Sequence, residues 1–166
     1  MKKYKIFISG VQKELKAERQ AIKEYVLGDV LFSEYFDVFL FEDAPARSRS
    51  AETAYLKEVR KSDSYIGILG EQYGSFSKEE KVSLTETDFR EAKTKHKNIL
   101  IYIKGRNGVD DKKREAGVQK LIKEIKDPKS GYSYRRFSNT AELTDLLYEK
   151  SHYHSQRKRC GREGWF

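Results

Sequence analysis

The stretch Ser64-Tyr65-Ile66-Gly67-Ile68-Leu69-Gly70 decides the fold class of this chain. It has the length of a strand, and both of its alternating faces carry bulky apolar side chains. A strand of this kind fits a parallel sheet that helices cover on both sides, whereas a half-exposed strand would alternate apolar with polar residues. We therefore expect an α/β protein in which this stretch is the most buried strand.

Four further runs of strand length accompany it, and helical patterns separate them. The runs span residues 4–8, 36–41, 98–103 and 132–137. Between them, apolar residues recur at helical spacing, as Val11, Leu15 and Ile22 do. Five strands that alternate with helices predict a three-layer αβα sandwich around a five-stranded parallel sheet with right-handed crossovers. Arg135 and Arg136 indicate that the last strand lies at an edge.

Capping signals predict where three of the helices begin. Ser50 is the predicted N-cap of the helix that precedes residue 64. Thr85 and Asp88 have the spacing of a capping box, although Asp is shorter than the preferred Glu or Gln. Asn139 and Glu142 form a better capping box and open the last helix.

The composition is that of one domain with a small core and a charged shell. The chain has 166 residues, of which 37% are hydrophobic and 36% charged. Helical periodicity fades near residue 150, so we expect a domain over 1–150 and a basic C-terminal tail over 151–166, separately ordered or disordered. No apolar run approaches the roughly 20 residues that span a bilayer. With a single cysteine, Cys160, and no signal peptide, we expect a cytoplasmic protein without a membrane partner.

The net charge of +8 raises the question of a nucleic-acid partner. The tail carries four Lys or Arg residues against Glu163, which suits loose, salt-dependent contact with polyanions. Elsewhere Lys and Glu alternate, as in residues 78–81, and such mixtures usually form a solvated face. Neither a zinc finger nor an RNA-binding sheet motif occurs in the sequence. We therefore expect no sequence-specific nucleic-acid partner.

The sequence also lacks the motifs that are typical of binding sites for common cofactors and metals. It contains no GxGxxG fingerprint, no P-loop and no GxSxG nucleophile elbow. His152 and His154 form an HxH pair in the tail, but no clear third ligand accompanies them. We expect neither a cofactor nor a metal.

The candidate site follows from the rule that open parallel sheets bind ligands beyond the carboxyl ends of their strands. The residues at those ends are Ser9, Gly10, Glu42, Asp43, Gly70, Tyr73, Gly74 and Lys104. Ser9 and Gly10 allow two interpretations. Their backbone N–H groups could bind an anion at a helix N-terminus, or Ser9 caps the helix while Gly10 serves a tight turn.

Several motifs in the first two thirds of the chain occur together in one known family. The first are Phe7-Ile8-Ser9-Gly10 and Leu15-Lys16-Ala17-Glu18-Arg19-Gln20-Ala21. Residues 62–70, Tyr73-Gly74, Ser83-Leu84-Thr85-Glu86 and Phe89-Arg90-Glu91-Ala92 follow. With this order and spacing, residues 4–104 resemble the bacterial family called domain of unknown function 4062.

The resemblance implies a relative of TIR domains and nucleoside 2-deoxyribosyltransferases, which are flavodoxin-like sheets of order 2-1-3-4-5. Family members often form the first domain of larger bacterial regulators. The enzymatic relatives break an N-glycosidic bond with a carboxylate on the helix after the third strand. The equivalent position is Asp88, where the relatives usually carry Glu; Glu86 is a second candidate, and a plain capping role for Asp88 is the alternative.

Two functions from different classes remain open. The favoured one is a non-catalytic sensor or interaction module of a bacterial regulatory, signalling or defence protein, with a nucleotide as ligand and self-association or a protein partner as output. The alternative is an enzyme that cleaves or transfers the N-glycosidic bond of a nucleotide such as NAD or of a deoxynucleoside. Asp88 in place of Glu withdraws the carboxylate by one methylene, which favours the first function because catalysis tolerates little displacement.

Overall fold

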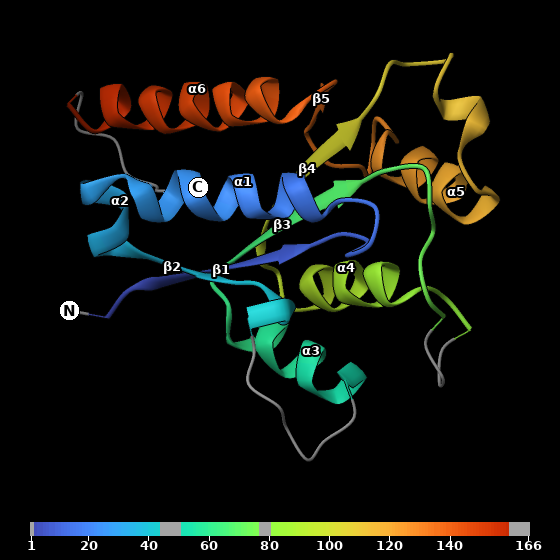
Figure 1. Cartoon of the computed structure of the whole chain (residues 1–166), viewed down its shortest axis with the longest axis horizontal. Helices are drawn as coiled ribbons and strands as arrows, with labels where there is room; N and C mark the ends of the chain where they lie inside the picture. The colour runs from blue at the N-terminus through green and yellow to red at the C-terminus, as the bar shows by residue number, and fades with distance from the viewer. Residues whose placement is uncertain (1, 44–50, 77–80, 160–166) are drawn as a thin grey trace.

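The computed structural model describes residues 2–43, 51–76 and 81–159, which form one sheet with helices on both faces (Figure 1). The strands are β1 (Tyr4–Ser9), β2 (Phe36–Phe39), β3 (Ser64–Leu69), β4 (Asn98–Lys104) and β5 (Tyr134–Phe137). The helices are α1 (Lys16–Gly28), α2 (Val30–Tyr35), α3 (Ala51–Lys61), α4 (Leu84–Thr94), α5 (Ala116–Ile125) and α6 (Thr140–Arg159), with 3-10 turns η1 (Phe41–Asp43) and η2 (Asp111–Lys113).

The five strands are parallel and lie in the order β2-β1-β3-β4-β5, which confirms the predicted sheet. All six residues of β3 are buried. This strand lies at the sheet centre, where Ile66 pairs with Ile8 of β1 and with Leu100 of β4. The stretch with apolar residues on both faces is therefore the one that needs cover on both sides.

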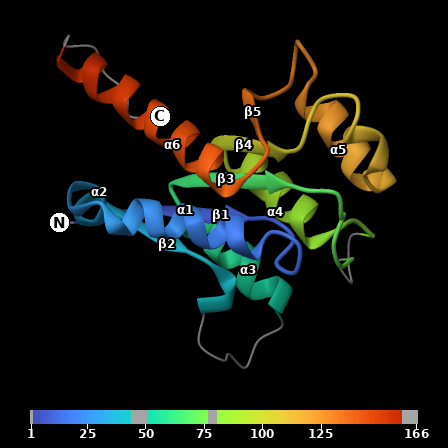
Figure 2. The same cartoon turned by 45° about the horizontal axis from the view of Figure 1, so that its top comes forward.

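Helices α1 and α6 cover one face of the sheet, and α3, α4 and α5 cover the other (Figures 1 and 2). On the first face, Leu15, Ile22 and Val26 of the α1 segment pack with Leu143 and Leu147 of α6. On the second face, the core joins the following side chains: Val59, Phe89, Ala92, Val118, Leu121, Ile122 and Ile125. The three-layer αβα architecture predicted from the sequence is thus confirmed.

Two helices differ from the sequence-based prediction. Helix α2 has no counterpart among the predicted elements, because none of its residues is buried and no apolar period marks it. It begins at Asp29, whose Oδ1 accepts the N–H groups of Leu31 and Phe32 at 2.9 and 3.0 Å. Helix α6 passes the predicted domain end at residue 150 and continues to Arg159, since no glycine or proline interrupts residues 140–159.

The start of helix α4 corrects the predicted capping box of Thr85 and Asp88. The N-cap is Ser83, whose Oγ accepts the N–H of Glu86 at 3.1 Å. Asp88 therefore lies in the second turn, where capping does not occupy it. The Asn139 cap is confirmed, because its Oδ1 accepts the N–H of Glu142 at 2.9 Å. The predicted cap Ser50 lies outside the described residues.

The loop after β1 corrects a second expectation about caps. Helix α1 begins only at Lys16, with Leu15 at its N-cap position and no side-chain cap bond. Ser9 therefore does not cap α1, and Ser9 and Gly10 do not form its N-terminus.

No helix within the described part of the chain is long and apolar enough to cross a membrane.

Candidate functional site

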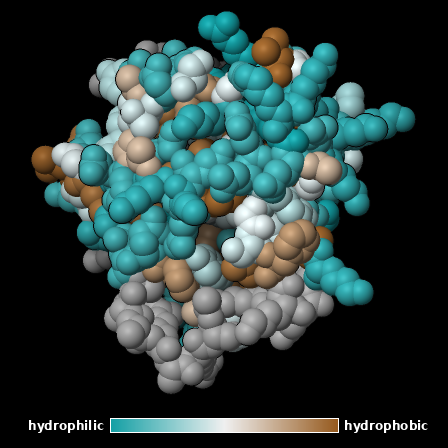
Figure 3. All heavy atoms as spheres, turned by 45° about the vertical axis from the view of Figure 1, so that its right-hand side comes forward, coloured by the Kyte–Doolittle hydropathy of each residue, from teal (hydrophilic) through white to brown (hydrophobic). Residues whose placement is uncertain are grey.

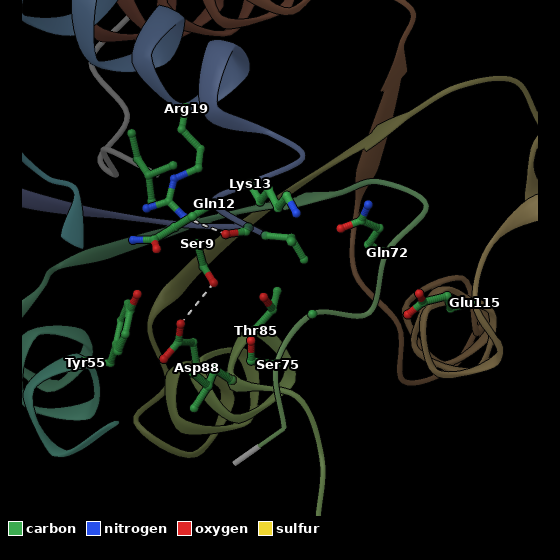
Figure 4. A pocket seen from close by; sticks show the side chains of 15 residues that line it. Ser9, Gln12, Lys13, Arg19, Tyr55, Gln72, Ser75, Thr85, Asp88 and Glu115 are labelled. Atoms are coloured by element: carbon green, nitrogen blue, oxygen red, sulfur yellow. Dashed lines mark hydrogen bonds between the residues drawn. The ribbon is translucent and has the colours of Figure 1, made fainter. Parts of the chain in front are cut away.

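A pocket of about 450 Å³ opens at the carboxyl edge of the sheet, between the loops that follow β1 and β3 (Figure 4). Helix α4 forms its floor and α3 contributes Tyr55 at one side. Its lining residues are Ile8, Ser9, Gly10, Val11, Gln12, Lys13, Arg19, Tyr55, Gln72, Gly74, Ser75, Leu84, Thr85, Asp88 and Glu115. This is the edge that the topology rule selects.

Asp88 brings a buried carboxylate to this pocket. The residue is 4% exposed, and its Oδ2 accepts the hydroxyl of Ser9 at 3.1 Å. Figure 4 shows the two side chains pointing toward one another, one from the end of β1 and one from α4. Burying a carboxylate costs free energy unless other groups stabilise it. A buried acid in a concave site is therefore a candidate for chemistry or for ligand binding.

Two tyrosine hydroxyls lie near this carboxylate. Burial raises the pKa of Tyr55, and the negative charge of Asp88 adds to that rise while the Arg19 guanidinium opposes it. Burial and Asp88 likewise raise the pKa of Tyr65, which is fully enclosed. Both side chains are thus neutral phenols at physiological pH. The Tyr55 ring stacks on Phe41 with centroids 3.9 Å apart, and its hydroxyl faces into the pocket.

Arg19 lies above the pocket and links α1 to the loops around it. Its side chain is 2% exposed. The Nη1 atom donates to the carbonyl of Gly10 at 2.5 Å, and Nη2 donates to Oε2 of Glu42 at 2.7 Å. The Nε atom has no hydrogen-bond partner among the described residues. Glu42, a predicted ligand-binding residue, is therefore held by Arg19 and also by Gln12 at 3.3 Å, and does not line the pocket.

Glu86 and Tyr73 lie outside the pocket lining, although the sequence analysis placed both at the site. The hydroxyl of Tyr73 donates to Oε2 of Glu86, and the Arg90 guanidinium donates to Oε1. Burial together with the Glu86 contact raises the pKa of Tyr73. Residues two positions apart on a helix face different directions. Glu86 therefore contacts its own partners while Asp88 faces the pocket.

Of the remaining predicted residues, two glycines line the pocket and three residues do not, one of them Lys104, which pairs with Glu18 at 2.5 Å. Gly74 has a φ of +88°, and a Cβ there would lie 3.0 Å from Val11. Gly10 also lines the pocket, with its backbone close to that of β3. Gly70 lies beside Glu14, and Asp43 pairs with Lys23 at 2.8 Å. The structure thus brings Ser9, Gly10, Gly74 and Asp88 together.

Two carboxylates hold the wall that follows β3. Glu14 accepts the backbone N–H groups of Glu71 and Gln72 at 2.6 and 3.0 Å. Glu115 accepts the N–H of Tyr73 at 2.7 Å. Three successive N–H groups are thereby bound to side chains from the β1–α1 loop and from the segment before α5, which fixes the position of Gln72 and of the turn beyond it.

The sequence analysis missed several pocket residues, and one of them carries a recognisable signal. Arg19 falls between Leu15 and Ile22 on the apolar stripe of the predicted first helix, where a charged residue must find a buried partner. Lys13, Tyr55 and the residues of the β3–α4 loop carry no such signal, because their place depends on how distant loops meet. Within the described residues, no group of three His, Cys, Asp or Glu could hold a metal ion.

Comparisons with known proteins agree with the fold. The model of the family described as domain of unknown function 4062 matches residues 5–152. No curated protein matches the chain. Among solved structures, the CMP N-glycosidase BcmB of Clostridium botulinum is similar with a TM-score of 0.54, over 87% of this chain and 98% of that one. The two are 11% identical, so the likeness shows the fold alone.

Proposed function

This chain belongs to the family described as domain of unknown function 4062, and we propose that it binds a nucleotide in the pocket and breaks that nucleotide's N-glycosidic bond. The observation that carries the proposal is the Asp88 carboxylate, buried at the pocket floor and hydrogen-bonded to Ser9. The similar structure of a CMP N-glycosidase adds support, since that protein acts on such a bond.

The chemistry requires a carboxylate in that place. As the bond between base and sugar breaks, positive charge develops on the sugar ring, and a fixed negative charge lowers the energy of that transition state. One oxygen of Asp88 then forms a bond to the anomeric carbon, while the base leaves with the electron pair of the broken bond and takes up a proton from solvent, which the later hydrolysis returns. Water hydrolyses the glycosyl ester and restores the carboxylate.

Other pocket residues suit a nucleotide ligand. The cavity of about 450 Å³ has the size typical of small-molecule sites. The neutral hydroxyl of Tyr55 can donate a hydrogen bond to a sugar or base oxygen. Lys13 adds a cation that has no acidic partner among the described residues, which suits a phosphate group.

Incubation with CMP, AMP, NAD and deoxynucleosides, followed by chromatography of the released base, tests the reaction. We expect base release by the wild-type protein and loss of at least about a hundredfold in Asp88→Ala and Asp88→Asn. Asp43→Asn, which changes an exposed carboxylate outside the pocket, serves as the matched control and should retain activity. Base release that persists in both Asp88 variants would rule out the proposed role.

A second candidate is the non-catalytic sensor or interaction module of a bacterial regulatory or defence protein. It is favoured by the short reach of Asp88, which is 4% exposed and already engaged with Ser9. In this function the nucleotide binds and is not consumed. Thermal unfolding separates the two candidates, because a ligand that binds the folded state raises the midpoint whether or not it reacts. A raised midpoint without base release would establish the sensor.

A further inference from the structure

The positive charge of this chain is concentrated in one segment. Residues 104–136 hold eleven Lys or Arg residues and five Asp or Glu residues, so this segment carries six of the eight net positive charges. The C-terminal tail, for which polyanion contact was expected, has a smaller net positive charge. The segment forms the end of β4, η2, α5 and β5.

Most of these cations lie at the surface. Six exposed ones lie on or beside η2 and α5, namely Arg106, Lys112, Lys113, Lys120, Lys123 and Lys129, and we call these exposed cations the basic face. Arg135 of β5 is also exposed, but it shares the side of the sheet on which Phe137 packs with α6. Helix α5 buries Val118, Leu121, Ile122 and Ile125 against the sheet, which turns Lys120 and Lys123 outward. Figure 3, with this side of the molecule forward, shows hydrophilic side chains over most of the surface and several long ones projecting from it.

The five acidic residues of the segment all have partners within the protein, and one of them, Asp110, pairs with Lys113 of the basic face at 3.7 Å. Asp111 binds Arg114 and Arg136 at 2.9 and 2.7 Å. Asp110 accepts the N–H of Arg106, and Glu115 accepts the N–H of Tyr73. Glu124 binds the Lys93 ammonium, and Asp127 accepts the N–H groups of Lys129 and Ser130. Lys112, Lys120 and Lys123 have no ion-pair partner among the described residues.

A hollow of about 600 Å³ lies within the basic face. Lys112, Lys123 and Lys126 line it, together with Asp111 and Asp127, whose carboxylates are already engaged. The lining thus has one more cation than carboxylates, and Asp111 is already paired with Arg114 and Arg136, so the hollow favours an anion. The hollow is separate from the pocket at the sheet edge, because the two share no lining residue.

We propose that the basic face binds the phosphate backbone of a nucleic-acid strand without reading its sequence. One phosphate would need one or two cations, whereas six exposed cations spread over η2, α5 and the loops beside them match a polymer with repeated charges. A membrane surface would also require exposed apolar side chains. In residues 104–136, Val109 is the exposed large hydrophobic residue, so a lipid surface fits less well.

Fluorescence anisotropy with a fluorescein-labelled 20-nucleotide oligothymidine, titrated at several NaCl concentrations, tests this proposal. The variant combines Lys112→Gln, Lys120→Gln and Lys123→Gln. The control combines Lys16→Gln, Lys57→Gln and Lys95→Gln, three exposed lysines on other surfaces, and has the same net charge. We expect the first triple variant to bind at least about tenfold more weakly and to lower the salt slope by about 2, and the control to change affinity less than about threefold.

Four results would overturn the proposal. The first is no binding of the oligonucleotide by the wild-type chain at low salt, and the second is an equal loss of affinity in the two triple variants. The third is a loss of affinity that appears only when Arg157, Lys158 and Arg159 are replaced by Gln. The fourth is displacement of the labelled strand by polyglutamate as readily as by unlabelled strand. Circular dichroism melts of each variant identify any that fail to fold. Base release from a nucleotide is measured separately and should be unchanged in the basic-face variant, so the two proposals can fail independently.

Discussion

At the scale of single residues, Gly74 determines how closely the β3–α4 loop approaches the loop after β1. Its φ of +88° disfavours any side chain, and a Cβ would lie 3.0 Å from Val11. We expect Gly74→Ala to lower the free energy of unfolding by about 1 to 3 kcal/mol and to weaken nucleotide binding. Urea denaturation and ligand titration measure the two effects.

Gly108 provides the matched control for that substitution. Its φ is +78°, yet no atom lies within 4 Å of the position that a Cβ would take. Gly108→Ala should therefore show the backbone strain without the contact against Val11 and without any effect on nucleotide binding. Equal binding losses in the two variants would mean that Gly74 has no particular role in the pocket.

Arg19 is the residue through which the loop after β1 and the segment after β2 are joined. Its guanidinium is almost fully enclosed and donates to Gly10 and Glu42. We expect Arg19→Ala to cost about 2 to 3 kcal/mol of unfolding free energy, because the Gly10 carbonyl and the Glu42 carboxylate lose their charged donor. Arg19→Lys should recover part of that loss, since an ammonium can reach one acceptor. If Arg19→Ala and Arg19→Lys lower the unfolding free energy equally, the hydrogen bonds of Arg19 do not stabilise the fold in this way.

At the scale of elements, the cap of α4 sets where Asp88 lies. Ser83 Oγ accepts the N–H of Glu86 at 3.1 Å. We expect Ser83→Ala to cost about 1 kcal/mol of unfolding free energy and Ser83→Asp to retain most of it. Thr85→Ala should leave stability nearly unchanged, because Thr85 is not the cap. Chemical denaturation of the three variants measures their unfolding free energies. A larger loss of stability in Thr85→Ala than in Ser83→Ala would favour the capping box predicted from the sequence.

The contrast between α4 and α2 shows what sequence patterns reveal about elements. The sequence offers two possible starts for α4, because Ser83 with Glu86 and Thr85 with Asp88 both have the spacing of a capping box. Burial resolves the competition, because the Ser83 cap lets Asp88 turn toward β1. Helix α2 buries no residue, so it leaves no period to detect. Helices that cover the sheet could be predicted, and the helix that does not cover it could not.

At the scale of the whole molecule, the sheet order and the edge that carries the pocket could be predicted for different reasons. The apolar run around Ile66 requires helices on both faces, which together with the family resemblance leads to the observed order. The topology rule then selects the edge at which the pocket lies and, with it, the lining residues Ser9, Gly10 and Gly74. It does not distinguish residues that line the pocket from those that support it, such as Glu42 and Glu86. That distinction depends on which cation each carboxylate meets in the folded chain, Arg19 for Glu42 and Arg90 for Glu86.

The ion pairs of Asp111 give the assembled domain a pH dependence in the acid range. Partial burial would raise the pKa of this carboxyl, but hydrogen bonds from Arg136 and Arg114 outweigh it and lower the pKa from 3.8 to about 2. A depressed pKa contributes stability that is present above the unfolded value and is lost as pH falls through the folded value. These pairs join η2 to β5, and Arg114 also donates to the carbonyl of Gly70 after β3 at 2.5 Å.

We therefore expect Asp111→Asn to destabilise the protein by about 1 to 2 kcal/mol at pH 7, a value reduced for solvent screening. The difference from wild type should shrink between pH 4 and pH 2, because the wild-type carboxyl then loses its charge as well. Urea denaturation of both proteins across that range measures the difference, with Asp145→Asn, at an exposed position on α6, as control. A stability difference that is the same at pH 7 and pH 2 would show that Asp111 acts through packing and hydrogen-bond geometry, with no contribution from its charge.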